Sequence, residues 1–270
     1  MGVATEYLRC DPELQWDDCR KRKHSNAVGP EEHGPIIATS GSRATVRSSA
    51  ISLPSRHMNE VLVLPTGSFA DASLAAARSS VSRPIVDHSI RSFLFARLLA
   101  DHEGCLNDTD YDEHLLFAAT VMHDLGLGER ATGEARFEVE GADLAAAVLR
   151  RHGVAERDVD RVWEAIALHA SVGIAHRRGL LTSLTHKGVF IDAGRVTDGV
   201  ADRLRQEVLN AYPRPAGDRS IADAIVAHAI RSKAAAPPGS LSFELLRQHR
   251  EAERAREGDL KGDLSWPTKQ

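Results

Sequence analysis

The segment that decides the fold is an apolar run ending in an adjacent histidine and aspartate, LFAATVMHDLGL at residues 116–127. Its apolar positions recur with the period of a helix that packs against a core. His123 and Asp124 stand at the end of this predicted helix, just before Gly126. A buried imidazole and a buried carboxylate are costly without partners, so hydrogen bonds or a cation must satisfy them. A single cation would satisfy both.

The same helical periodicity continues on both sides of this segment, from Ser68 onward, and strand patterns are nearly absent. Glycines and prolines separate the periodic stretches, as in the Ala-Pro-Pro-Gly sequence at residues 236–239. The sequence therefore predicts an all-α fold. The expected helices cover residues 71–79, 84–103, 113–122, 141–151, 158–169, 180–196, 198–210, 220–233 and 241–257.

The chain divides into three predicted parts. Residues 1–57 mix Pro, Gly, Ser and charged residues without periodicity, which is typical of a poorly ordered arm. Residues 58–235 contain most of the helical pattern and are expected to form one domain. Residues 236–270 are interpreted as a linker and a helix that packs on this domain or trails from it.

Composition narrows the class of partner. The chain has 34 Lys and Arg against 38 Asp and Glu, and its densest basic stretch, residues 20–24, lies in the irregular arm, so we expect no nucleic-acid partner. Cys10, Cys19 and Cys105 show no CxxC spacing, which argues against a thiolate zinc knuckle. The first 25 residues lack a secretory apolar core, and no stretch approaches the roughly 20 apolar residues of a membrane span. A cytoplasmic protein without a membrane partner is expected.

Two further motifs extend the His-Asp pair into a larger set. HSIRSF at residues 88–93 begins with His88, and GVFID at residues 188–192 ends with Asp192. The order His, His-Asp, Asp resembles the ligand set of the HD superfamily, in which a helical bundle gathers four side chains around one divalent ion. The resemblance implies an HD-domain bundle over residues 58–235, with His88, His123, Asp124 and Asp192 as metal ligands.

The residues around these ligands resemble one branch of the superfamily, the cyanamide hydratases. The matching motifs are HSxRSxxF from His88, the segment at 116–127, AIALHAS at 165–171 and GVxID at 188–192, and the likeness covers about residues 61–243. It implies a metal-dependent hydratase that adds metal-bound hydroxide to a small nitrile-type substrate such as cyanamide, giving an amide or urea. The long charged arm and His176-Arg177-Arg178 depart from the hydratase pattern and leave the substrate in doubt.

The ligand chemistry points to one divalent ion. Two neutral imidazoles and two carboxylates combine borderline and hard donors, which suits zinc first and ferrous iron second. Such an ion lowers the pKa of its bound water toward neutrality. We therefore expect Asp124 to serve both as a ligand and as part of the catalytic centre.

His169 lies on the apolar face of its predicted helix, where the resembling family carries a histidine near the substrate. We interpret it as a catalytic acid-base or anchoring group, because histidine titrates closest to neutral pH. Three further residues are candidates for contact with substrate. They are Phe137, expected in a loop after the metal motif, His186, and Arg91, which could instead brace Asp124 or Asp192 or form an ordinary core ion pair.

Other functions remain open at this point. An HD phosphohydrolase would use the same ligands with cationic side chains aimed at a phosphate, which Arg130, Arg136, Arg177, Arg178 and Lys187 could supply. A two-iron oxygenase would need additional histidines, and His169 and His186 occupy the required interval. A scaffold that has lost catalysis is disfavoured by the intact ligand set. An apolar helix face in the carboxy-terminal third would suit a homodimer.

Overall fold

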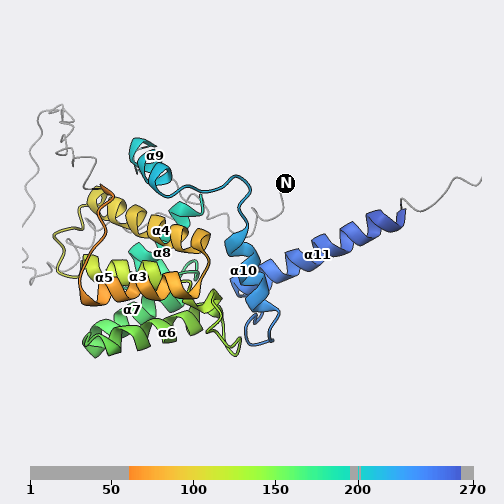
Figure 1. The fold of residues 1–270 in the computed structure, drawn as a ribbon, viewed down its shortest axis with the longest axis horizontal. Helices are drawn as coiled ribbons and strands as arrows, with labels where there is room; N and C mark the ends of the chain where they lie inside the picture. The colour runs from red at the N-terminus through yellow and green to blue at the C-terminus, as the bar shows by residue number, and fades with distance from the viewer. Residues whose placement is uncertain (1–60, 195–199, 201, 263–270) are drawn as a thin grey trace, which may run out of the picture.

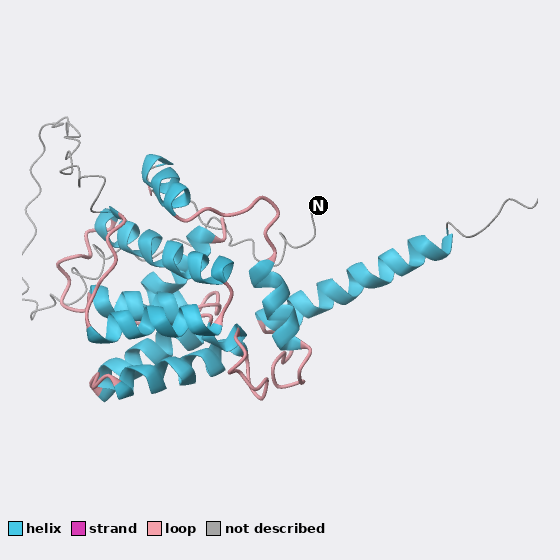
Figure 2. Ribbon diagram, viewed as in Figure 1, coloured by secondary structure: helices cyan, strands magenta, loops and turns pink. Residues whose placement is uncertain are grey.

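The computed structural model describes residues 61–194, 200 and 202–262, and every regular element in this part of the chain is a helix (Figures 1 and 2). The all-α prediction is therefore confirmed. The predicted arm at residues 1–57 lies outside the described residues, as do residues 263–270. The α-helices are α3 (Ser68–Ser80), α4 (Arg83–His102), α5 (Glu113–Met122), α6 (Phe137–Arg151), α7 (Glu156–Leu168), α8 (Leu180–Asp192), α9 (Asp202–Ala211), α10 (Ser220–Ala229) and α11 (Leu241–Gly262).

The core of the bundle surrounds α8. Every residue of α8 is buried, because α4, α5 and α7 pack around it (Figure 1). Helix α6 packs against α7, and α3 packs against α5 and α6. Aromatic residues fill the interior, as where the rings of Phe93 and Phe117 meet edge to face at 5.0 Å. The interior thus fixes α4, α5 and α8, the helices that carry the predicted metal ligands.

A glycine allows α8 to approach α4 closely. A Cβ atom at Gly188 would overlap the carbonyl oxygen of Ser92 and would lie only 2.7 Å from Cβ of Ala96. Only glycine fits this crossing without a shift of one helix. The close approach brings Asp192, at the end of α8, against His88 in the second turn of α4.

Helix α6 begins earlier than the sequence pattern indicates. We predicted its start at Gly141 and a loop at Phe137, but Phe137 is the first residue of the helix, so this prediction was wrong. We interpreted Gly141 as the first residue of this helix, whereas it lies inside the helix. It packs closely against the backbone of Gly126 and His123. Close backbone approach, and not helix termination, explains this glycine.

Helix α8 ends sooner than predicted. The pattern indicated residues 180–196, but the helix ends at Asp192 and Gly194 adopts a left-handed conformation with φ of 71°. That conformation is the usual reason for glycine just beyond a helix. Asp192 is therefore the last residue of α8 and not an interior position of the helix. Helix α5 matches its predicted range at both ends, and α10 and α11 begin where predicted. The ends of α3, α4 and α7 differ from the predicted ranges by one to three residues.

Helices α10 and α11 lie beside the bundle, and α11 extends away from it (Figure 1). They share a small core of their own, formed by Val226, Ala229, Ala236 and Leu246. Among the described residues, none of the helices combines the length and the apolarity that a membrane crossing requires.

Candidate metal centre

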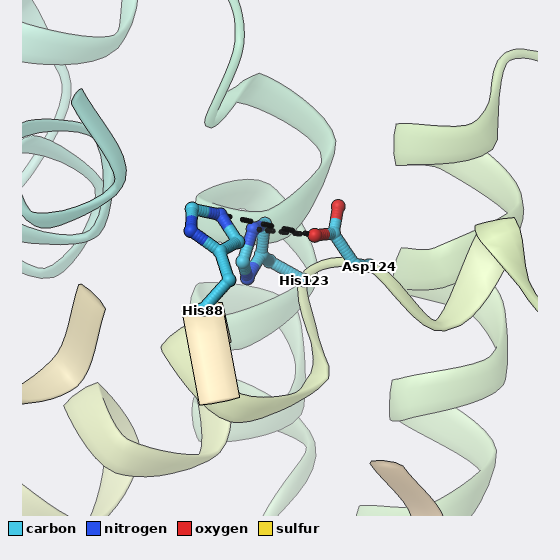
Figure 3. A group of neighbouring side chains, drawn as sticks. All are labelled: His88, His123 and Asp124. Atoms are coloured by element: carbon cyan, nitrogen blue, oxygen red, sulfur yellow. Dashed lines mark ion pairs between the residues drawn. The ribbon is translucent and has the colours of Figure 1, made fainter. Parts of the chain in front are cut away.

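Three of the predicted ligands converge inside the bundle. His88 comes from α4, His123 caps the end of α5, and Asp124 follows directly, before a short 3-10 turn at Leu125–Leu127. Each offers a ligand atom, and these atoms lie within 4.8 Å of one another (Figure 3). All three residues are buried. Within the described part of the chain, these three residues form the group of histidine, cysteine, aspartate or glutamate side chains that is compact enough to hold a metal ion.

The hydrogen bonds of His123 and its distance from Asp124 show why a cation fits here. Nδ1 of His123 lies 2.7 Å from the carbonyl oxygen of Thr120, so in the neutral ring Nδ1 donates and Nε2 carries the lone pair. That Nε2 lies 3.1 Å from Oδ2 of Asp124, which is buried and has no hydrogen-bond partner. Nε2 of His88 lies 3.9 Å from the same oxygen. Electron pairs that face one another in a buried space require a positive charge between them. A proton on His123, whose pKa is raised by Asp124, can supply it, and a divalent ion bound to both side chains would take the place of that proton.

Asp192 reaches the same site but contacts the other nitrogen of His88. Its Oδ2 lies 2.6 Å from Nδ1 of His88. Arg91 donates to both carboxylate oxygens, at 2.7 and 3.0 Å, and Arg214 donates to Oδ1 at 2.8 Å. Of the two partners that we considered for Arg91, the structure shows Asp192. Ligation of a metal by Asp192 itself stays a prediction.

Burial and charge set the ionisation of these groups. Burial raises the pKa of Asp124, but the positive charge of His123 and His88 outweighs it and holds this pKa at about 2. Burial likewise opposes ionisation of Asp192, yet His88 and Arg91 keep its pKa well below the ordinary value. Burial lowers the pKa of His123, and attraction to Asp124 more than compensates and raises it. Both carboxylates are therefore anionic at neutral pH, as metal ligands must be.

His169 lies beside the three converging residues. It caps the end of α7, and its ring centre lies 4.7 Å from that of His123. Nδ1 lies 2.7 Å from the carbonyl oxygen of Ile166, which leaves Nε2 as the lone-pair nitrogen. Burial and the charge of His123 lower its pKa to about 3. His169 is thus a neutral, oriented hydrogen-bond acceptor, while its catalytic role stays a prediction.

A cavity of about 370 Å³ opens onto these side chains. Phe137, predicted to contact substrate, lines it and places its ring 5.7 Å from that of His169. Arg91 also lines it. His186 is not among the lining residues, since it lies behind His169, with Nδ1 2.6 Å from the carbonyl oxygen of His169. Its contact with substrate remains untested, and the structure places it as a support for the His169 backbone.

Sequence reasoning missed two parts of this cavity. Arg214 contacts Asp192 from the segment between two predicted helices, where Pro213 and Pro215 flank it. Aliphatic residues of α10 and α11 also form part of the wall. Their spacing of four residues was a usable signal for a shared face, but nothing in it indicated that the face turns toward the metal ligands. The aliphatic residues are Ile221, Ile225, Leu241 and Leu245.

Comparison with known proteins agrees with this geometry. A search of curated proteins returned no match to the chain. The sequence does match the HD domain over residues 85–229, which is more than half of the chain and contains His88, His123, Asp124 and Asp192. The protein therefore belongs to the HD domain family.

Proposed function

We propose that this protein is a metal-dependent hydratase, similar to cyanamide hydratases, that adds water to the nitrile carbon of an uncharged substrate. The product is an amide, or urea when the substrate is cyanamide. Membership of the HD domain family supports a metal-dependent enzyme of hydrolase type, and His88, His123 and Asp124 lie close enough to hold the ion. The nitrile-type substrate is the finer step of the proposal.

The observation that carries the proposal is that the converging residues face a largely apolar cavity in which each arginine among the described lining residues contacts a carboxylate. Arg91 and Arg214 both bind Asp192, and Arg219 lies 3.2 Å from Asp223. Away from the candidate metal ligands and the arginines, the cavity wall includes Phe137 and several aliphatic residues. Such a wall favours an uncharged substrate body, since a charged group that lies against apolar side chains loses its hydration without a polar partner.

His88, His123, Asp124 and Asp192 would hold one divalent ion, with zinc or ferrous iron best suited to this donor set. When bound, such an ion acts as a Lewis acid and lowers the pKa of water toward neutrality. Arg91 fixes the position of Asp192 by its two hydrogen bonds, and Asp192 in turn orients His88 through its contact with Nδ1. Because the pKa of Asp124 is low, its carboxylate is negatively charged at neutral pH.

His169 would manage the proton. Its Nδ1 is held by the Ile166 carbonyl, so Nε2 can accept a hydrogen bond from water that enters the cavity. The water oxygen forms the new bond to the nitrile carbon, and its protons end on the nitrogen, giving the amide after tautomerisation. Water and nitrile together account for every atom of the product, so the reaction needs no further co-reactant.

A phosphohydrolase is less well supported by the contacts. None of the five cationic residues that we considered for a phosphate lines the cavity. Three of them instead contact acidic side chains: Arg136 pairs with Glu138, Arg178 with Glu164, and Lys187 with Glu103. A two-iron oxygenase would need further ligands, yet His186 does not reach the cavity and His169 is not part of the compact group.

The direct test is a substrate screen of the purified metal-loaded protein. Cyanamide, a series of aliphatic nitriles and a panel of nucleotides are incubated with the enzyme, and amide, urea and inorganic phosphate are quantified. The proposal expects amide or urea from a nitrile-type compound and no phosphate from nucleotides. Phosphate release without any amide or urea would overturn it in favour of a phosphohydrolase.

A further inference from the structure

The cavity extends well beyond the converging histidines. Ile221 and Ile225 on α10 are four residues apart, and so are Leu241 and Leu245 on α11. This spacing puts each pair on one face of its helix. All four line the cavity, so two aliphatic faces from adjacent helices form one continuous wall.

Hydrogen bonds hold α10, which carries half of this wall, in place relative to the candidate metal centre. Arg231, just after α10, donates to the carbonyl oxygen of Ala131 at 2.6 Å, and Ser232 donates to the carbonyl oxygen of Gly133. Nε2 of His228 lies 3.5 Å from Oε2 of Glu140 on α6. These contacts tie α10 to the segment between the His-Asp pair and α6. The aliphatic wall is therefore part of the built site and not a loose cover.

The size of the cavity exceeds the needs of the smallest nitriles. Cavities of about 300–1,000 Å³ are those that hold drug-sized organic ligands. A substrate as small as cyanamide would leave most of the 370 Å³ unfilled. The arginines among the described lining residues all contact carboxylates, and the wall away from them is mainly apolar, so the remaining volume offers chiefly apolar contact.

We propose that the natural substrate carries an uncharged aliphatic body, which lies against Ile221, Ile225, Leu241 and Leu245 while its reactive carbon faces His169. The proposal rests on the hydratase function above and names its substrate class. Burying each further methylene of such a body raises affinity about fourfold until the wall is covered. Chain length is therefore the property that this wall selects.

Binding of product-type ligands tests the wall without any turnover. Linear primary amides from acetamide to octanamide are titrated into the metal-loaded protein by calorimetry. Affinity is expected to rise about fourfold per methylene over the first members and then to level off. A flat series, or tighter binding of succinamic acid than of butanamide, would overturn the proposal.

Two variants and one matched control locate the effect. Leu245→Trp and Ile221→Trp fill the cavity from residues that are only partly buried, so the bundle core is left intact. Each should weaken the longer amides at least tenfold and leave acetamide unchanged. Ile230→Trp, at the exposed end of α10, should change neither. Equal loss in all three variants would refute the role of the wall.

The two proposals fail in distinguishable ways. Length-dependent amide binding together with no conversion of any nitrile would reject the hydratase function. Conversion of nitriles at rates and affinities independent of chain length would keep that function and reject the aliphatic substrate.

Discussion

Arg91 on α4 closes two hydrogen bonds on Asp192 at the end of α8, at 2.7 and 3.0 Å, and both side chains are almost fully buried. This pair joins the two helices that pack most closely in the bundle. It also holds the carboxylate that contacts His88. The ion pair that joins α4 to α8 is therefore directly connected to the candidate metal centre through His88.

Arg91→Lys should destabilise the fold and loosen the metal centre. A lysine ammonium keeps the charge but cannot reproduce the bidentate contact, and the lost hydrogen bond to a charged group costs about 1.5–3 kcal/mol. Urea unfolding measures the loss. Arg214→Lys is the matched control, because its side chain is 40% exposed and gives Asp192 a single side-chain bond. If both variants unfold at the same urea concentration, the buried pair does not have this role.

His169→Ala should retain the metal and lose turnover. The removed ring supplies a single oriented acceptor, and proton transfer by such a group is worth about 10²–10⁴-fold in rate. Metal content and kcat are measured on the same preparation, with the surface variant His249→Ala as the control. Loss of metal in His169→Ala would instead make His169 a ligand and would revive the two-metal alternative.

Gly188→Ala should lower stability because the added methyl meets the Ser92 carbonyl and Ala96 across the α4–α8 contact. Overpacking of this kind costs about 1–3 kcal/mol. Gly179→Ala is the control, since a Cβ there meets no atom within 4 Å and Gly179 has a negative φ. Thermal melts of the two variants are compared. Equal melting temperatures would show that the helices can move apart without penalty.

Glu140→Gln tests the segment that precedes α6. Burial raises the pKa of Glu140, but donors from Ala135, Gly133, Thr132 and Glu134 outweigh it and lower this pKa to about 2. A depressed folded pKa adds stability above the unfolded value of 4.5, and this contribution disappears as pH falls toward 2. The variant should lose about 2 kcal/mol at pH 7, as expected for hydrogen bonds to a charged group.

The pH profile of melting distinguishes this charge effect from simple packing. The difference between wild type and Glu140→Gln should shrink between pH 4.5 and pH 2, where the wild-type carboxylate takes up its proton. A difference that stays constant over this range would contradict the assigned role of the charge.

Helical periodicity predicted the helices because it is a local feature, whereas the order of the proposed ligands came from the resemblance to the HD superfamily. Periodicity misplaced the start of α6, since Gly141 lies inside the helix in close contact with the backbone of Gly126 and does not mark a helix end. Arg214 could not be predicted either, because its partner Asp192 lies 22 residues away and on the far side of α9 in the sequence. Close backbone approach and long-range pairing are set by the assembled bundle, so single-sequence reasoning does not reach them.

Metal content of the purified protein tests the central claim most directly. Inductively coupled plasma mass spectrometry on wild type, His123→Ala and Asp124→Ala, each confirmed as folded by circular dichroism, measures bound transition metal per chain. We expect about one divalent ion in the wild type, as in four-ligand sites of this donor type, and near-complete loss in both variants. A folded wild type that takes up no metal, or a His123→Ala variant that retains it fully, would contradict the account.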